Sequence, residues 1–409
     1  MIDTDHKTIL ERFINTIPSI VYGTEKINFI LDNVEKISPN ERIILRHALN
    51  KMLTSMIERE ASDIEIGGYG NGGFVWLRVF GSKERVKEFP RFTEDEATVL
   101  IANLLNKNQH RYLITTKNLD FSYTFYYERK KIEARFRACA YYDLESLALN
   151  MRAISTEVRS LESLEFHPNV VKAMSHGYIK FGLSLVTGIT GSGKSTTLDA
   201  IIAAHNKIDP AHIVIIASPI EYVHKSNISI IRHREVGRDV ISFKDGVIQS
   251  LRQDPDIIVI GEMRDPDTIL AALEVTDTGH KVFSTLHTSS AVESIDRIVA
   301  EVHPTEQDRV RNRLADVLIS VVSQKLVPSL DGKRVLVKEV LVVTPSVKAA
   351  IKNNNTSEIY MMINQGGQGG MITMEQDLKR LYLSKKISLE TALAYANNKT
   401  RIQQILTAV

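Results

Sequence analysis

Cysteine is nearly absent from this chain of 409 residues, whose single thiol is Cys139. One thiol excludes a disulfide within the chain and a zinc site built from four cysteines of one chain. Cys139 lies between two alanines in a strand-like run. We therefore expect an inert core thiol.

Long apolar runs are also missing, since no stretch of about 18 apolar residues, the length that spans a bilayer, occurs. Residues 1–7 lack the basic start and apolar block of a secretion signal. The formal net charge of +2 gives no general attraction for nucleic acid or a membrane surface. We expect a cytoplasmic protein without a transmembrane segment or a direct nucleic-acid partner, which reaches a membrane only through another protein.

The composition is that of a globular protein, with 43% hydrophobic and 24% charged residues. Five parts are predicted along the chain. They are a helical N-terminal extension (1–57), a small α+β domain (58–155), a polar linker (156–167), an α/β domain (168–343) and a helical C-terminal region (344–409).

Two hairpins are predicted in the small domain. The first surrounds a glycine cluster at 67–73, which we interpret as a turn and not as a phosphate loop, because no helix follows it directly. The second spans 121–138, where apolar side chains alternate with Glu133, Arg135 and Arg137.

The α/β domain alternates apolar strand-like runs with helical segments, a pattern typical of a mostly parallel sheet with helices on both faces. The predicted strands are 183–187, 212–217, 257–260 and 281–284.

Residues 188–195 read Gly-Ile-Thr-Gly-Ser-Gly-Lys-Ser and fit the pattern G-x-x-x-x-G-K-[ST] of a phosphate-binding loop. An apolar run precedes them and a helical pattern follows, which is the context such a loop requires. We expect Lys194 to reach the β- and γ-phosphates of ATP, and the Ser195 hydroxyl to bind Mg²⁺. The predicted nucleotide-binding residues are Gly188, Thr190, Gly191, Ser192, Gly193, Lys194, Ser195 and Thr196.

The apolar run 257–260 is followed by Gly261 and then by an acid, Glu262. In phosphate-loop proteins an acid at this edge of the sheet lies beside the bound Mg²⁺. Glu262 is therefore the second predicted metal-binding residue, beside Ser195.

Several longer motifs resemble those of secretion and pilus ATPases. Residues 254–265, Asp-Pro-Asp-Ile-Ile-Val-Ile-Gly-Glu-Met-Arg-Asp, are similar to the Walker B segment of that family. Residues 278–288 resemble its histidine box, and 219–224 the end of its aspartate box. Residues 234–239 are similar to a stretch typical of PilT-like pilus retraction ATPases. The resemblance runs almost unbroken from about residue 168 to residue 352.

The resemblance implies a homo-hexameric ring ATPase with a PAS-like N-terminal domain, a RecA-like P-loop motor domain and ATP bound between subunits. By position, Glu221 matches the catalytic glutamate that polarises the attacking water, and Glu262 matches the Walker B glutamate near Mg²⁺. His287 matches a histidine that senses the γ-phosphate or the neighbouring subunit. Arg137 and Arg152 match two arginines of the N-terminal domain that reach nucleotide.

Four of these residues also have a purely structural interpretation. Glu221 would then be solvated after a proline turn, and Glu262 would cap the next turn. His287 would be a hydrogen-bonded structural histidine, and Arg137 would belong to a solvated strand face.

The sequence departs from the family in three places. Ala217-Ser218 stand where the family has an acidic pair, the string 346–353 only partly matches one linked to retraction, and the N-terminal 50 residues are longer than usual. These differences indicate a divergent branch, such as one that serves a type IVb bundle-forming pilus.

The leading interpretation is an Mg²⁺-dependent ATPase that drives disassembly of a type IV pilus. It would act at the cytoplasmic face of the inner membrane, on a pilus platform protein. The first alternative is the ATPase of a Dot-like type IV secretion or conjugative system. A pilus assembly ATPase is disfavoured, because those proteins are longer and carry a four-cysteine zinc site. A non-hydrolysing nucleotide-gated assembly module is a third possibility, against which the retained Lys194, Glu221 and Glu262 argue.

Overall fold

The computed structural model describes residues 2–79, 82–129, 131–154 and 158–407. They form two compact units: residues 1–156 with 218–222 and 237–239, and residues 157–217, 223–236 and 240–409. The first two residues of the predicted linker, 156 and 157, lie outside the described ranges. Within those ranges no helix is both long enough and apolar enough to cross a membrane. The five parts predicted from the sequence stay a prediction.

The first unit begins with helices α1 (Ile2–Ile14), α2 (Gly23–Asn33) and α3 (Pro39–Glu58) and the short 3₁₀ turn η1 (Val34–Lys36). The start of α3 is set by a capping box, in which Ser38 and Glu41 each satisfy a backbone N–H of the other. Leu45, Leu49, Met52 and Met56 form an apolar stripe on α3, and all four are buried. Their helical spacing alone favours a helix here, and the structure confirms it.

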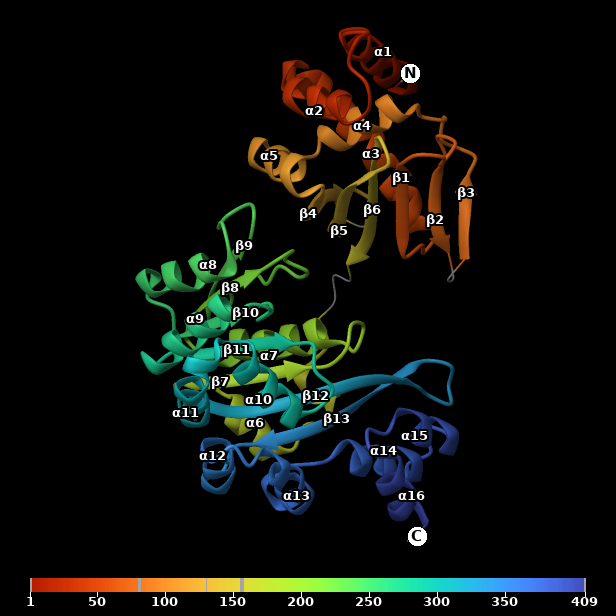
Figure 1. Cartoon of the computed structure of the whole chain (residues 1–409). Helices are drawn as coiled ribbons and strands as arrows, with labels where there is room; N and C mark the ends of the chain where they lie inside the picture. The colour runs from red at the N-terminus through yellow and green to blue at the C-terminus, as the bar shows by residue number, and fades with distance from the viewer. Residues whose placement is uncertain (1, 80–81, 130, 155–157, 408–409) are drawn as a thin grey trace. The chain divides into compact units, whose positions relative to one another are not determined.

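An antiparallel sheet completes the first unit (Figure 1). Its strands are β1 (Asp63–Gly67), β2 (Val75–Val79), β3 (Ser82–Val86), β4 (Asn118–Tyr127), β5 (Ile132–Asp143) and β6 (Ser146–Ile154), in the order β3-β2-β1-β6-β5-β4. Helices α4 (Glu94–Ala102) and α5 (Lys107–Thr116) lie between β3 and β4 in sequence. Side chains from the N-terminal helices and from the sheet form one core. Both predicted hairpins are confirmed by the β1–β2 and β4–β5 pairings.

Cys139 lies on β5 and is half-buried, so the expectation of a core thiol is only partly met. Burial, and then the charge of Asp120, raise the pKa of the thiol to about 11. Because the thiolate is the reactive form, this thiol is unreactive near neutral pH.

The second unit contains a seven-stranded sheet among its described residues. Its strands are β7 (Gly182–Thr187), β8 (His212–Ala217), β9 (Ile230–Glu235), β10 (Ile257–Ile260), β11 (Lys281–Leu286), β12 (Leu318–Pro328) and β13 (Arg334–Val342), in the order β13-β12-β7-β11-β10-β8-β9. All neighbours are parallel except β12 and β13. Strands β7, β10 and β11 are buried along their whole length, as expected where helices cover both faces. The predicted α/β fold is confirmed, although β9, β12 and β13 were not among the predicted strands.

The helices around this sheet are α6 (Pro168–Met174), α7 (Lys194–Ile208), α8 (Phe243–Ser250), α9 (Pro266–Asp277), α10 (Ala291–Ala300) and α11 (Gln307–Val317). The C-terminal region is helical, as predicted, with α12 (Pro345–Lys352), α13 (Ile359–Gln365), α14 (Met374–Leu383), α15 (Leu389–Tyr395) and α16 (Lys399–Thr407). Figure 1 shows α14, α15 and α16 together at the C-terminal end of the chain. They share a small apolar core with Val327 and Val337 of the β12–β13 hairpin.

One lysine is fully buried at the start of β11. The Lys281 ammonium donates hydrogen bonds to the carbonyls of Ala173 (3.2 Å) and Ile179 (3.0 Å), just before and after the C-terminal end of α6. Burial lowers the pKa of Lys281 to about 8. The side chain therefore satisfies one carbonyl in the last turn of α6 and one in the segment that follows, and it joins this part of the chain to the sheet.

Candidate functional site

The phosphate loop connects β7 to α7, as the sequence predicts. Gly193 is the N-cap of α7 and has a φ of 89°, and Gly188 has a φ of 149°, both in the region that favours glycine. A Cβ at Gly188 would lie 2.4 Å from the carbonyl oxygen of Gln324 and 2.4 Å from Ser192 Oγ. The loop therefore closes on itself and on β12 too tightly for a side chain at Gly188.

Lys194 and Ser195 open the first turn of α7, and both are half-buried. The Lys194 ammonium donates to the carbonyls of Gly188 (2.8 Å) and Ile189 (3.2 Å), so it lies over the loop. Thr190, Gly191 and Thr196 are exposed around the loop, whereas Ser192 is buried inside it. The backbone N–H groups at the start of α7 and the ammonium together favour a phosphate here.

Glu262 and His287 meet at the same edge of the sheet. Glu262 follows β10, His287 follows β11, and β11 pairs in parallel with both β10 and β7. His287 Nε2 lies 3.7 Å from Glu262 Oε2, and Arg264 Nε lies 2.7 Å from the same oxygen. Because the phosphate loop follows β7, three predicted site segments emerge side by side from adjacent parallel strands.

The environment keeps His287 neutral. Burial, followed by the positive charges of Lys194, Arg264 and Arg297, lowers the pKa of His287. A neutral imidazole can both donate and accept a hydrogen bond, which suits a group that detects a phosphate or a water. Because the charge of Lys194 helps to lower this pKa, His287 lies close enough to the phosphate loop to interact with it electrostatically.

Glu221 and the two predicted arginines lie in the first unit. Glu221 is in the segment 218–222 that follows β8, and Arg137 Nη1 lies 3.8 Å from its Oε1. Arg137 on β5 and Arg152 on β6 are direct cross-strand partners. Arg152 Nε is 2.8 Å from Oδ1 of the buried Asp63. The structure brings these arginines together on one sheet, and the roles predicted for all three residues stay predictions.

The segment that carries His287 is held from the C-terminal side. Glu339 on β13 is buried and accepts a hydrogen bond from the Ala291 N–H, 2.8 Å away, at the first residue of α10. Burial raises the pKa of Glu339 to about 7. Two residues after His287, the Ser289 carbonyl accepts a hydrogen bond from Asn397, which precedes α16.

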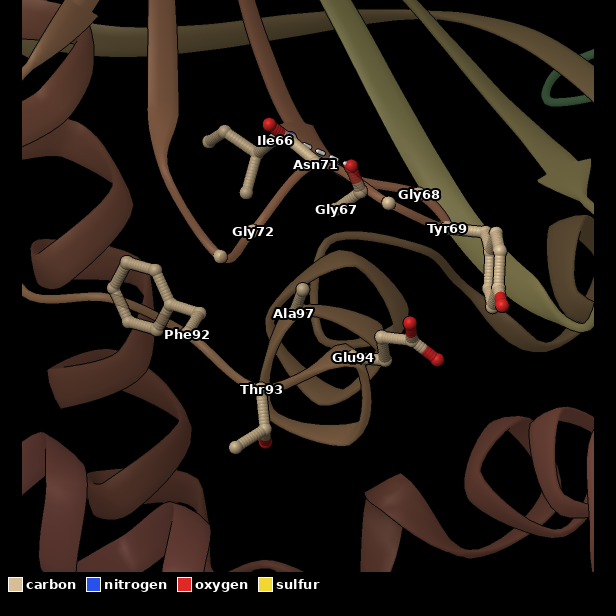
Figure 2. A pocket seen from close by; sticks show the side chains of 12 residues that line it. Ile66, Gly67, Gly68, Tyr69, Asn71, Gly72, Phe92, Thr93, Glu94 and Ala97 are labelled. Atoms are coloured by element: carbon tan, nitrogen blue, oxygen red, sulfur yellow. Dashed lines mark hydrogen bonds between the residues drawn. The ribbon is translucent and has the colours of Figure 1, made fainter.

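The glycine cluster at 67–73 lines a pocket of about 470 Å³ in the first unit. Figure 2 shows the first turn of α4 opposite the glycine loop. A helix N-terminus beside glycines resembles a phosphate site, but this first turn carries Glu94, Asp95 and Glu96. Their negative charge would oppose an anion. The interpretation of the cluster as a turn, rather than as a second phosphate loop, therefore agrees with its surroundings.

The phosphate loop fits the phosphates of a nucleotide. The Ser192 hydroxyl is buried and has no hydrogen-bond partner among the described residues, so a phosphate oxygen would satisfy it. No group of three or more His, Cys, Asp or Glu side chains in the described ranges is arranged to hold a metal.

The phosphate loop lies between a strand and a helix at the carboxyl edge of a parallel sheet, and an acid and a histidine follow neighbouring strands. This arrangement defines a P-loop nucleotide-binding protein of the RecA-like class. Residues 39–385 match the family described as Type II/IV secretion system protein. The chain belongs to this family and is a secretion-type ATPase.

Similarity to individual proteins of known name or structure supports this family assignment. The twitching motility protein of Neisseria gonorrhoeae is 38% identical over 323 residues, which cover 79% of this chain and 84% of that protein. A crystal structure of the pilus retraction motor PilT with bound ADP is similar at a TM-score of 0.76 and 35% identity, covering 87% of this chain and 98% of that one. The Legionella pneumophila ATPase DotB is similar at a TM-score of 0.74 and 27% identity, covering 88% and 95%.

Three residues at the site were not predicted from the sequence: Arg264, Arg297 and Gln324. Arg264 lies within the Walker B-like motif, only two residues after Glu262. Arg297 Nη1 lies 3.4 Å from the His287 carbonyl, in a contact that no local pattern indicates. Gln324 could have been recognised from the sequence, because it is a polar residue within the mostly apolar run that forms the buried strand β12.

Proposed function

We propose that this protein is an Mg²⁺-dependent ATPase that powers the disassembly of a type IV pilus. The observation that carries the chemistry is the convergence of the phosphate loop, Glu262 and His287 at one edge of the sheet. The similarity to a twitching motility protein and to a pilus retraction motor supports pilus retraction as the work performed. The proposal includes the pilus type that the sequence indicates, a type IVb bundle-forming pilus served by a divergent branch of the family.

Phosphoryl transfer requires positioning, charge neutralisation and an oriented water, and the chain offers a candidate residue for each task. The loop N–H groups and Lys194 would hold the β- and γ-phosphates and neutralise their charge. Glu221 would accept a hydrogen bond from the attacking water and orient it. His287, kept neutral by burial and by its cationic neighbours, would contact the γ-phosphate or its water.

Ser195 and Glu262 fit the requirements of Mg²⁺. The Ser195 hydroxyl is in the first turn of α7, and Glu262 offers a carboxylate after β10, which β11 separates from β7. When bound, Mg²⁺ would neutralise the negative charge that develops on the phosphate oxygens. Arg264 holds Glu262 through its 2.7 Å contact and would set the direction of the carboxylate.

We further propose that six copies form a ring whose sites are completed between subunits. Arg137 and Arg152 are side by side on β5 and β6, and their side chains are 45% and 68% exposed. Two exposed guanidinium groups on one sheet can reach the nucleotide site of a neighbouring copy. An arginine supplied in this way stabilises the charge of the transition state and raises kcat by about 10³–10⁵-fold in other phosphate-loop enzymes.

Mixed rings test completion between subunits. A subunit with Arg137→Ala and Arg152→Ala, mixed with a Lys194→Ala subunit, should regain part of the ATPase activity that each lacks alone. Steady-state phosphate release from rings shown by mass spectrometry to contain both subunits measures this. Mixed rings that stay as inactive as their parents would contradict the proposal.

Pilus disassembly as the work of this ATPase can be tested by substitutions in the string 346–353, most of which forms α12. Val347, Ala350 and Ile351 are buried, as their helical spacing predicts. Lys348 and Lys352, however, both contact Asp316: Lys348 Nζ reaches its backbone carbonyl at 3.1 Å, and Lys352 Nζ its carboxylate at 2.7 Å. We propose that the two lysines, four residues apart on α12, face a partner protein, and the test has to separate that role from this local contact.

Replacing Lys348 and Lys352 together by glutamate should leave ATP hydrolysis largely intact and abolish pilus disassembly in cells. Asp316→Asn is the matched control, because it breaks the ion pair but keeps both positive charges, and it should retain function. Gene deletion should leave cells with persistent or excess pili, counted by electron microscopy. Cells without pili after deletion would indicate an assembly motor instead.

The alternative function is the same chemistry in a Dot-like secretion or conjugative system, which the similarity to the ATPase DotB favours. Deletion would then leave pili unchanged and abolish transfer of DNA or effector protein. In either machine the ring would act at the cytoplasmic face of the inner membrane, bound to a platform protein there.

A further inference from the structure

Gln324 lies directly behind the phosphate loop. It is 1% exposed, and its Nε2 donates a 2.8 Å hydrogen bond to the carbonyl oxygen of Ser192. A Cβ at Gly193 would lie 3.3 Å from the same nitrogen. The amide therefore contacts the loop at the two residues that precede Lys194.

The neighbouring side chain on β12 continues this contact into β7. Ser323 and Thr187 are both fully buried, and their hydroxyl oxygens share a hydrogen bond of 2.8 Å. Thr187 is the last residue of β7, so it leads directly into the loop. Gln324 and Ser323 thus hold both ends of the loop against one strand.

A buried hydroxyl pathway leads from Thr187 to the His287 segment. Ser294 Oγ on α10 lies 3.4 Å from Thr187 Oγ1, and it shares a 2.6 Å hydrogen bond with Thr288. Thr288 follows His287 in the chain. The loop and the histidine are therefore connected through fully buried polar side chains.

Two atoms in this arrangement have no hydrogen-bond partner among the described residues: Ser192 Oγ and Gln324 Oε1. A buried polar atom without a partner is costly, and in native proteins it usually has a functional explanation. The Ser192 hydroxyl lies in the interior of the loop, where a phosphate oxygen would accept its proton.

We propose that Gln324 and Ser323 are positioning residues for nucleotide. Gln324 holds the Ser192 carbonyl away from the phosphates, and Ser323 holds Thr187 in register with the His287 segment. The inference rests on the proposed function in that the loop binds nucleotide. A carboxylate at position 324 would not serve, because it lacks the N–H that the Ser192 carbonyl requires.

Gln324→Met tests this role, because methionine has a similar length and apolar stem but makes no comparable hydrogen bond. Isothermal titration of the full chain with MgADP should show affinity reduced about tenfold, the effect expected when a buried carbonyl loses its partner. ADP binding is a readout that does not depend on turnover. The KM for ATP should rise more than kcat falls.

A matched pair separates positioning from stability. Ser320 on β12 also forms a buried hydroxyl pair with β7, at 3.1 Å to Ser184, but three residues further from the loop. Ser323→Ala and Ser320→Ala should lower Tm by similar amounts, and only Ser323→Ala should weaken MgADP binding. Equal effects of the two substitutions on affinity would mean that the hydroxyl pairs are merely structural.

The outcomes are distinguishable. A folded Gln324→Met protein that binds MgADP as tightly as wild type would overturn this inference and leave the proposed function intact. Wild-type protein that fails to bind MgADP would overturn the nucleotide site itself, and the inference with it. If Gln324→Met does not fold, the pair of serine substitutions decides.

Discussion

Lys194→Ala is expected to abolish most ATP hydrolysis. The ammonium lies over the phosphate loop, bonded to the carbonyls of Gly188 and Ile189, and it is the cation best placed to neutralise transferred phosphate. Losing one preorganised electrostatic contact of this kind costs about 10²–10³ in kcat elsewhere, and weaker ATP binding should add to the loss. Phosphate release and the ATP-induced rise in Tm measure the two effects separately.

Lys207→Ala is the matched control, since Lys207 is an exposed lysine at the opposite end of α7. It should change neither rate nor binding. If the Lys194→Ala protein hydrolysed ATP at the wild-type rate, the phosphate loop would not be the catalytic site.

Glu221→Gln is expected to retain ATP binding and lose turnover. An amide of the same size keeps the volume of the side chain but is a far weaker base and acceptor for the attacking water. General-base contributions are about 10²–10⁴-fold, which is the expected loss in kcat. Binding of ATP, measured at equilibrium, should stay within a few-fold of wild type.

Retained binding acts as the internal control of this experiment, because it separates a catalytic defect from a folding defect. Near-normal phosphate release would assign the water to another residue. Glu262 would be the next carboxylate to test, because it lies beside His287.

The parts of the fold that the sequence predicts are those with a local signal. Strands β7, β8, β10 and β11 are apolar runs, and the phosphate loop is a short motif between a strand and a helix. β9 was missed because it lies at the edge of the sheet and carries Arg232 and Arg234, which suit an edge strand. β12 was missed because serines and Gln324 interrupt its apolar pattern. Ser320 and Ser323 pair with hydroxyls of β7, and Gln324 bonds to the phosphate loop, so only the tertiary structure explains these polar residues.

In the candidate site, too, the residues with a local sequence signal were predicted and those placed by tertiary contacts were not. Gly188 to Thr196 and Glu262 are recognisable from short segments, because their chemistry depends on the local chain. The contacts of Arg297 with the His287 segment and of Gln324 with Ser192 join positions that are distant in sequence. Such contacts depend on tertiary packing, and one sequence without its fold does not specify them.

The buried Lys281 links a helix to the strand that leads to His287. Its ammonium joins the end of α6, which follows the connection from the first unit, to the first residue of β11. β11 runs without a break from Lys281 to Leu286, and His287 follows directly. A displacement of the end of α6 would therefore act on the same strand that presents His287.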